Sequence, residues 1–204
     1  MWWPRLGIEV ERIPPATPSA NVDATPENLL HNGVMGSIYA QDCLGIEDPT
    51  VGLLNVGEEP EKGSKRFKEA YQLLSAGGVK FIGNVEGGDV FAGGADVVVT
   101  DGFTGNVILK LLEQFGGFVM NKVAAGAEKA GTELSADVFG AVVQDLDYAA
   151  YGGALLLGVD GVVVIGHGKS DSRAVGNALR QAARAADAGV NQHIIAGLGA
   201  CGMA

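Results

Sequence analysis

Apolar positions follow two rhythms along this chain, one typical of buried strands and the other of amphipathic helices. Short apolar runs predict strands at residues 51–55, 79–82, 95–100 and 161–165. Apolar residues at three- and four-residue spacing predict helices at residues 64–75 and 172–188. They also predict a long helix that begins at residue 106, followed after a turn by a second helix at about 136–145. Strands that alternate with helices predict an α/β fold with a doubly wound, mostly parallel sheet of four strands.

The helix expected first along the chain, at about 25–44, has clear signals at both ends. Thr25 is a good N-cap, Pro26 suits the first helical position, and Gly45 suits the C-cap. Gly33 and Gly36 inside this helix lower its intrinsic stability. The sequence therefore predicts close packing against a neighbouring element at these two positions.

Residues 1–20 differ in character from the rest of the chain. They hold four of the seven prolines and both tryptophans, a composition that disfavours helices and central strands. We expect a loosely ordered arm over residues 1–20 and one α/β unit over residues 21–204, with a helical hairpin at about 106–147.

Composition narrows the classes of function. The chain has 204 residues, is 47% hydrophobic and carries a formal charge of −10. It can bury a core, but it lacks the excess of Lys and Arg that nucleic-acid binding needs. The two cysteines form no C-x-x-C pair, and neither a signal segment nor an apolar run long enough to cross a bilayer is seen. These features predict a cytoplasmic protein.

The candidate site residues follow the predicted strands. In an open parallel sheet, ligands bind beyond the carboxyl ends of the strands. Glycine lets a backbone approach a ligand there, and the helices that follow offer N–H groups to an anion, so a phosphate or carboxylate site is predicted. Four segments fit, at residues 55–63, 83–89, 101–106 and 166–171. Their candidate side chains are Asn55, Lys62, Asn84, Glu86, Asp101, Thr104, Asn106, His167, Lys169 and Ser170.

Ordinary structural roles compete with these assignments. Asp101 and Asn106 have the residue types of a turn and a helix cap. His167 is flanked by two glycines, which leaves functional and structural interpretations about equally favoured. Cys43, within a predicted helix, fits a small buried hydrophobe better than a nucleophile.

Two familiar motifs are matched only superficially. Residues 197–202 fit G-x-G-x-x-G, but no helix follows them, as a dinucleotide site requires. Residues 57–64 resemble a phosphate-binding P-loop, yet the three glutamates among them would repel a triphosphate. The sequence contains neither the G-x-S-x-G of serine hydrolases nor the H-E-x-x-H of zinc proteases, and it predicts no metal site.

Longer motifs surround the candidate residues. They include Leu-Leu-Asn-Val-Gly-Glu-Glu at 53–59 and Val-Val-Val-Thr-Asp-Gly-Phe-Thr-Gly-Asn at 97–106. The full series stands in order at residues 21–27, 34–40, 52–59, 81–87, 96–106, 151–154 and 167–171. From about residue 20 to the C-terminal helix, the chain resembles the bacterial phosphate acyltransferases of phospholipid synthesis, the PlsX family.

The resemblance implies an enzyme of the transferase class. Such an acyltransferase moves a fatty acyl group from acyl carrier protein to inorganic phosphate and so gives acyl phosphate. The resemblance also implies a Rossmann-like sheet related to the isocitrate dehydrogenase fold, a homodimer, and weak peripheral association with the inner face of the membrane. It implies no metal or organic cofactor.

The resemblance and the spacing together suggest roles for the candidate residues. His167 would bind phosphate or shuttle a proton, and Lys62 would anchor its charge. Asp101 would orient a lysine or a histidine. Asn84 and Asn106 would donate to phosphate or to the developing thioester oxyanion, and the remaining candidates would help to bind the substrate.

Three departures from the family pattern accompany the resemblance. The family's N-terminal strands do not precede Asn21, so the chain resembles only the C-terminal part of such an enzyme. Gly88 stands where the family usually has arginine, and Leu155 where it has proline. Two alternatives therefore stay open. One is a catalytically inactive, dimeric remnant, and the other is an oxidoreductase of the isocitrate dehydrogenase type, for which the sequence shows no dinucleotide site.

Two surfaces are expected to bind partners. A group of basic side chains predicts either a docking patch for the acidic carrier protein or an ordinary solvated helix face. The group consists of Lys62, Lys65, Arg66 and Lys68. The apolar positions of the 106–147 hairpin predict packing against the same hairpin of a second subunit. Acidic residues outnumber basic ones over residues 113–147, so attraction to anionic lipid is expected to be feeble.

Overall fold

The computed structural model describes residues 21–132 and 152–201. The expected arm over residues 1–20 and the return helix at about 136–145 lie outside the described residues. The helices are α1 (Pro26–Leu44), α2 (Lys65–Ala76), α3 (Gly87–Ala92), α4 (Gly102–Lys129), α6 (Ser172–Asp187) and α7 (Val190–Ala200). The strands are β1 (Thr50–Leu54), β2 (Lys80–Val85), β3 (Val97–Val99), β4 (Ala154–Leu156) and β5 (Val163–Ile165).

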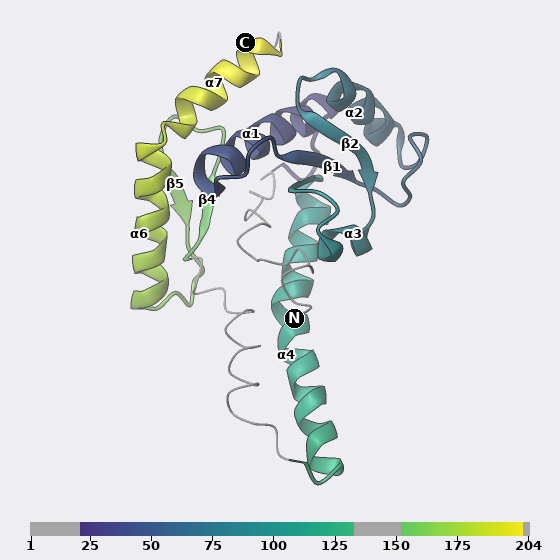
Figure 1. The fold of residues 1–204 in the computed structure, drawn as a ribbon, viewed down its shortest axis with the longest axis vertical. Coiled ribbons are helices and arrows are strands. Elements are labelled where there is room, and N and C mark those ends of the chain that lie inside the picture. The colour runs from purple at the N-terminus through teal and green to yellow at the C-terminus, as the bar shows by residue number, and fades with distance from the viewer. Residues whose placement is uncertain (1–20, 133–151, 202–204) are drawn as a thin grey trace.

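A parallel sheet of three strands, in the order β2-β1-β3, confirms the predicted α/β class. The expectation of four strands in one sheet is wrong, because β5 pairs with β4 in a separate antiparallel sheet. A short turn joins β4 to β5, and strands joined by a short turn pair antiparallel, whereas parallel neighbours need a long crossover. Figure 1 shows the two sheets on opposite sides of α1.

The larger core lies between α1, α2 and one face of the parallel sheet. Val51, Val97 and Val99 are among its buried strand residues. A Cβ at Gly36 would lie only 2.7 Å from Cγ1 of Val97, and one at Gly33 would lie 2.7 Å from the Leu74 side chain. The predicted close packing of this helix at its glycines is therefore confirmed.

A second core joins the far side of α1 to α6, α7 and the β4–β5 pair. Tyr39 of α1 is buried there beside Leu155 of β4, and its hydroxyl accepts a hydrogen bond of 2.9 Å from Nε2 of Gln181. On the same side, Nδ1 of His193 lies 2.7 Å from Oδ2 of Asp42 and ties α7 to α1. Helix α1 thus holds both halves of the described structure together.

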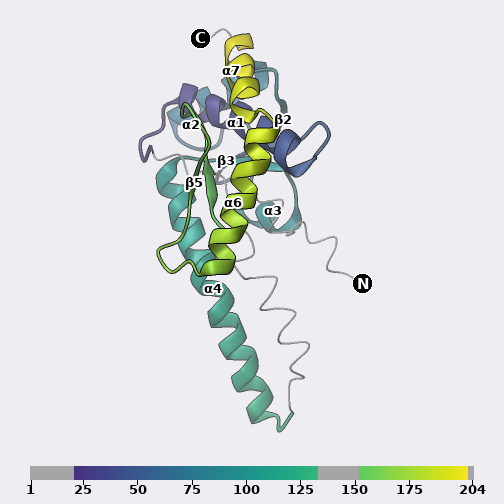
Figure 2. The same ribbon diagram turned by 90° about the vertical axis from the view of Figure 1, so that its left-hand side faces the viewer.

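Several boundaries differ from the predicted ones. Helix α4 begins at Gly102 rather than at Asn106, because Asp101 caps it. Helices α3 and α7 and strand β4 were not predicted. Gly197 and Gly199 lie inside α7, which agrees with rejecting a dinucleotide-binding turn there. Figures 1 and 2 show α4 running from the end of β3 to well beyond the other elements.

Candidate functional site

The carboxyl ends of β1, β2 and β3 meet at one edge of the parallel sheet, which we call the carboxyl edge. It comprises residues 55–63, 83–89 and 101–106, and Figure 1 shows α3 and the start of α4 beside it. Seven of the ten candidate residues lie on this edge. They are Asn55, Lys62, Asn84, Glu86, Asp101, Thr104 and Asn106.

Asn55 and Asn84 organise the loop that follows β1. Nδ2 of Asn55 donates to Oδ1 of Asn84 at 3.1 Å and lies at the same distance from the carbonyl oxygen of Lys62. Asn84 is buried, and its Nδ2 donates to the carbonyl oxygen of Glu59 at 2.8 Å. These amides link two strand ends to the turn that carries Lys62. These hydrogen bonds therefore fix the conformation of the loop at the carboxyl edge.

Lys62 reaches the edge from a turn that depends on glycine. Gly63 has φ +84°, and a Cβ there would lie 2.5 Å from the side-chain amide of Asn55. Only glycine fits that conformation and that contact without strain. Nζ of Lys62 lies 3.8 Å from a carboxylate oxygen of Glu59, and both side chains are about half exposed. An entering anion can therefore compete for this ammonium group.

Asp101 is the one candidate carboxylate that is buried, with 5% of its surface exposed. Its Oδ1 accepts the N–H of Thr104 at 2.7 Å and so caps α4. Its Oδ2 accepts Nη2 of Arg66 at 3.0 Å. Asp101 therefore acts as a helix cap. It also holds a basic side chain in place, and that side chain is Arg66 rather than the expected lysine or histidine. Asn106 lies in the helix, exposed, and is not the cap.

Glu86 and Gly88 flank the start of α3. Glu86 is the exposed N-cap of this helix, and its N–H donates to Oδ2 of Asp89 at 2.7 Å. A Cβ added at Gly88 would meet no atom within 4 Å. The position where the family pattern has arginine therefore has open space around it.

His167, Lys169 and Ser170 lie apart from the carboxyl edge, on the loop between β5 and α6. Figure 1 shows this loop at the foot of α6, on the other side of the molecule from α3. The backbone N–H of Lys169 donates to Nδ1 of His167 at 3.2 Å, and Asp171 caps α6 through the N–H of Ala174. The structure does not gather all four predicted loops, because β5 belongs to the second sheet.

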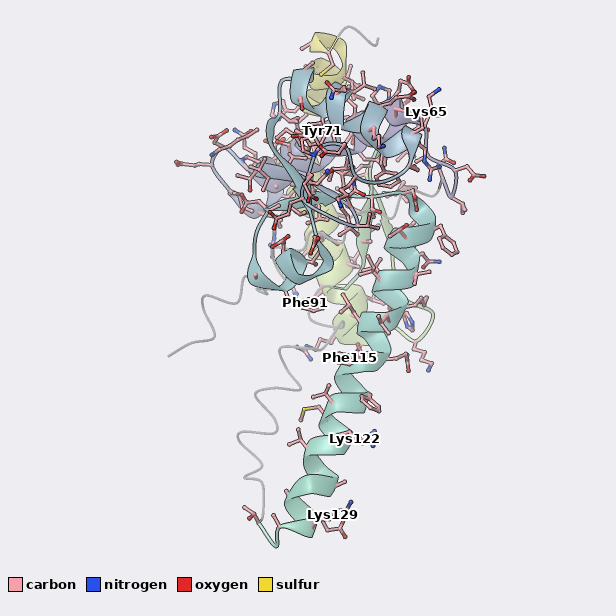
Figure 3. The ribbon with its side chains drawn as sticks, turned by 90° about the vertical axis from the view of Figure 1, so that its right-hand side faces the viewer. Lys65, Tyr71, Phe91, Phe115, Lys122 and Lys129 are labelled. Atoms are coloured by element: carbon pink, nitrogen blue, oxygen red, sulfur yellow. The ribbon has the colours of Figure 1, made fainter. Side chains whose placement is uncertain are left out.

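The predicted basic patch is partly neutralised by acidic neighbours. Lys65 is 92% exposed and lies 3.6 Å from a carboxylate oxygen of Glu69, one helical turn further on. Figure 3 shows Lys65 pointing away from the rest of the protein. Arg66 turns the other way and pairs with Asp101. The Arg66–Asp101 pair was missed in the sequence, since 35 residues separate the two.

The described residues contain neither a cluster of metal ligands nor a membrane-spanning helix. No cluster of three or more His, Cys, Asp or Glu side chains there could hold a metal ion. No helix within residues 21–132 and 152–201 is both long and apolar enough to cross a membrane.

Comparison with known proteins gives a consistent result. The family described as fatty acid synthesis protein matches residues 18–193. Phosphate acyltransferases of Dehalococcoides mccartyi and Elusimicrobium minutum are 43% and 46% identical to this chain, over 182 and 184 residues. A third, from Desulforamulus reducens, is 45% identical over 175 residues.

These alignments cover most of this chain but much less of the relatives. They take in 86%, 86% and 84% of the chain, in the order D. mccartyi, E. minutum and D. reducens. They take in 52%, 54% and 53% of the respective relatives. The chain therefore spans about half the length of the curated relatives it matches.

Proposed function

The chain belongs to the fatty acid synthesis protein family, and from this membership we propose that it is an acyltransferase that uses phosphate as acceptor. It transfers a fatty acyl group from acyl carrier protein to inorganic phosphate, giving acyl phosphate for phospholipid synthesis. The names of the similar proteins support the reaction class. The observation that carries the proposal is a pair of linked sets on the carboxyl edge. Asn55 and Asn84 hold the turn that carries Lys62, and Asp101 joins the start of α4 to Arg66.

The reaction makes few chemical demands. A phosphate oxygen attacks the thioester carbonyl carbon, the C–S bond breaks, and the carrier thiol leaves with the electron pair and takes up a proton. A thiol of pKa about 8.5 leaves with little acid assistance. The harder task is to hold a phosphate dianion against the carbonyl carbon without leaving its charge unpaired.

The carboxyl edge suits that task. Lys62 supplies positive charge from a turn held by glycine and asparagine. Helix α4 starts at this edge with the positive end of its dipole. The N–H groups of Gly102 and Thr104 are engaged by the Asn21 carbonyl oxygen and by Asp101, so we assign the exposed amide of Asn106 as the donor that this helix offers to phosphate. Asn55, Asn84, Glu86 and Thr104 shape the walls of the proposed phosphate site.

His167 forms a second part of the proposal, together with Lys169 and Ser170. Because Nδ1 of His167 accepts a hydrogen bond from the Lys169 backbone, the neutral imidazole carries its proton on Nε2. We assign His167 as a phosphate ligand or proton shuttle, to be tested apart from the carboxyl edge.

The exposed side of α4 supports a homodimer. Phe103, Val107 and Leu111 lie four residues apart on one side of the helix and are 50% to 63% exposed. Phe115 and Phe118 continue this side and stack with ring centroids 6.2 Å apart. Figure 3 shows Phe115, Lys122 and Lys129 in order along the helix. We propose that two subunits pair along this stripe, in the cytoplasm, with weak attachment to the inner face of the membrane.

Phosphate-dependent release of the carrier thiol tests the proposed reaction. The protein is incubated with a long-chain acyl carrier protein, and free thiol and acyl phosphate are measured as phosphate is raised. Sulfate replaces phosphate in the control, because it has the same shape but does not form a stable acyl product. Release that requires phosphate supports the proposal, and release of the thiol without phosphate contradicts it.

A second candidate is a catalytically inactive, dimeric remnant. Gly88 favours it, because it stands where the family pattern has arginine and so offers no guanidinium group to bind phosphate. A folded dimer that releases no thiol at any phosphate concentration would establish this candidate.

A further inference from the structure

The ion pair between Arg66 and Asp101 joins two elements at the carboxyl edge. Arg66 lies in the first turn of α2, and Asp101 immediately precedes α4. Nη2 of Arg66 lies 3.0 Å from Oδ2 of Asp101, whose side chain is 7% exposed. The other oxygen of Asp101 is engaged by the N–H of Thr104. The carboxylate is therefore fixed through both of its oxygens.

A fixed carboxylate conflicts with phosphate binding nearby. Asp101 is buried on the edge where the proposed function needs a dianion, and like charges repel strongly when little water separates them. A cation that stays beside Asp101 removes this repulsion. Lys62 cannot be that cation in the geometry seen, because its ammonium group lies beside Glu59.

Arg66 has the chemistry to do more than neutralise Asp101. A guanidinium group has five N–H donors in a planar fork that matches phosphate oxygens, and the hydrogen bond to Asp101 involves Nη2 alone. The side chain is 34% exposed, so part of it is open to solvent. Its central carbon also lies 5.6 Å from the centre of the Phe67 ring. Being held already, Arg66 would lose little conformational freedom on binding an anion.

We propose that Arg66 is a phosphate-binding residue of the carboxyl edge, held in place by Asp101. The inference rests on the proposed function and adds to it a residue outside the ten candidates. Asp101 is then a positioning residue that acts through Arg66. The purely structural alternative is that Arg66 only cancels the charge of Asp101 and never touches phosphate.

Binding of inorganic phosphate to the whole chain, followed by titration calorimetry, separates these alternatives. We expect Arg66→Gln to weaken phosphate binding by about tenfold or more, because a charge-assisted hydrogen bond and the screening of Asp101 are lost together. Lys65→Gln is the matched control, since it removes the same charge from the neighbouring, 92% exposed side chain. We expect it to change the affinity by less than about twofold.

A double variant distinguishes contact from charge cancellation. Asn also caps helices, so Asp101→Asn removes the repelling charge and keeps a cap at α4. If Arg66 binds phosphate, Arg66→Gln combined with Asp101→Asn recovers only part of the lost affinity. Full recovery to the wild-type affinity would show that Arg66 merely cancels a charge, and would overturn the inference.

Two further variants test the role of Arg66 in case Arg66→Gln does not fold stably. Arg66→Lys keeps the charge but loses the fork, so we expect weaker binding than wild type even where the unfolding midpoint is unchanged. Gly88→Arg, at a position where an added Cβ meets nothing within 4 Å, offers a second guanidinium group at the same edge. In the Arg66→Gln background it should restore part of the affinity.

The failure of this inference differs from failure of the proposed function. Equal phosphate affinity in wild type and Arg66→Gln, with phosphate-dependent thiol release intact, overturns the role of Arg66 alone. A folded wild-type chain that neither binds phosphate nor releases thiol overturns the proposed function, and the role of Arg66 with it.

Discussion

His167 offers a test of function at a single exposed side chain. If it binds phosphate or shuttles a proton, His167→Ala should lower turnover by about ten- to a thousandfold, the range typical of a lost proton-transfer group. The side chain is exposed, so the unfolding midpoint should stay near that of wild type. Steady-state turnover and thermal unfolding, measured on the same preparation, check both expectations.

His193 provides the matched control for this variant. It is also an exposed histidine, but it pairs with Asp42 between α7 and α1. His193→Ala should keep wild-type turnover. A His167→Ala protein that is fully active, or one that unfolds, would remove His167 from the site.

We expect the Cys43 thiol to make the free energy of unfolding depend on pH in the alkaline range. Burial, with a smaller effect of Asp42, raises the pKa of the Cys43 thiol from 9.0 to about 11. Between these values the unfolded chain has already released the proton that the folded chain still holds. The free energy of unfolding should therefore be unaffected by this group below pH 9 and fall as pH rises from 9 through about 11.

Urea unfolding between pH 8 and 12 measures this effect. Cys43→Ala should make the fall between pH 9 and 11 shallower than in wild type. Some decline should remain, because burial also raises the pKa of Tyr39 above 10.0. Identical pH profiles for the two proteins would show that the thiol does not contribute.

Sequence reasoning predicted the residue types of the carboxyl edge better than their partners. Asn55 and Asn84 could be selected because each lies at the end of a predicted strand. Their mutual hydrogen bond depends on which strands become neighbours, and the periodicity of one chain does not contain that information. The same holds for Arg66 and Asp101, which meet only when the first turn of α2 lies beside the residue that follows β3 and caps α4.

At the scale of elements, the glycines of α1 test how tightly it packs on the parallel sheet. Gly36→Ala places a methyl group 2.7 Å from Cγ1 of Val97 on a buried strand. We expect this overpacking to lower the free energy of unfolding by about 1–3 kcal/mol, although alanine favours helix. Chemical denaturation gives the difference directly.

Gly176→Ala in α6 is the control for helix propensity. The nearest atom to its added methyl group is Nη2 of Arg180 at 3.8 Å, an ordinary contact. This variant should raise the free energy of unfolding by about 0.5–1 kcal/mol. If Gly36→Ala were stabilising as well, α1 would not pack on β3 as closely as described.

The elements predicted well are those whose signals are local. Thr25 and Gly45 mark the ends of α1 as expected, and α6 begins at Ser172 as predicted. Strand β4 and helix α3 are only three and six residues long, too short for a periodic pattern to stand out. The start of α4 was misplaced because Asp101 was assigned to a turn, whereas its side chain caps the helix.

At the scale of the whole molecule, a protein of charge −10 needs local positive charge to bind an acidic carrier protein. Lys65 and Lys68 are exposed, while Arg66 is held by Asp101. Changing Lys65 and Lys68 to Glu should therefore raise the KM for the carrier substrate and weaken its salt dependence, with the KM for phosphate unchanged. Initial rates at several salt concentrations test this, and an unchanged KM for the carrier would eliminate the patch.

The exposed stripe of α4 leads to a prediction about assembly. Five large apolar side chains on one side of a projecting helix would not stay solvated without cost, and a second copy of the same stripe covers them symmetrically. We expect a dimer by light scattering at micromolar concentration, and a monomer after Leu111→Asp combined with Phe118→Asp. Because both side chains are more than half exposed, the subunit should stay folded. Ile195→Asp, which charges a 70% exposed residue of α7, should leave the dimer intact.

The same helix sets the expected strength of membrane binding. Membrane-surface helices are usually rich in Lys and Arg on their polar side. Within residues 113–132 the helix has Lys122 and Lys129, and Lys122 already lies 5.4 Å from the centre of the Phe118 ring. Binding to liposomes should therefore be weak, insensitive to salt, and similar for anionic and neutral lipid. Tight binding to anionic vesicles alone, measured by co-sedimentation, would contradict this and would favour α4 as a membrane contact over a subunit interface.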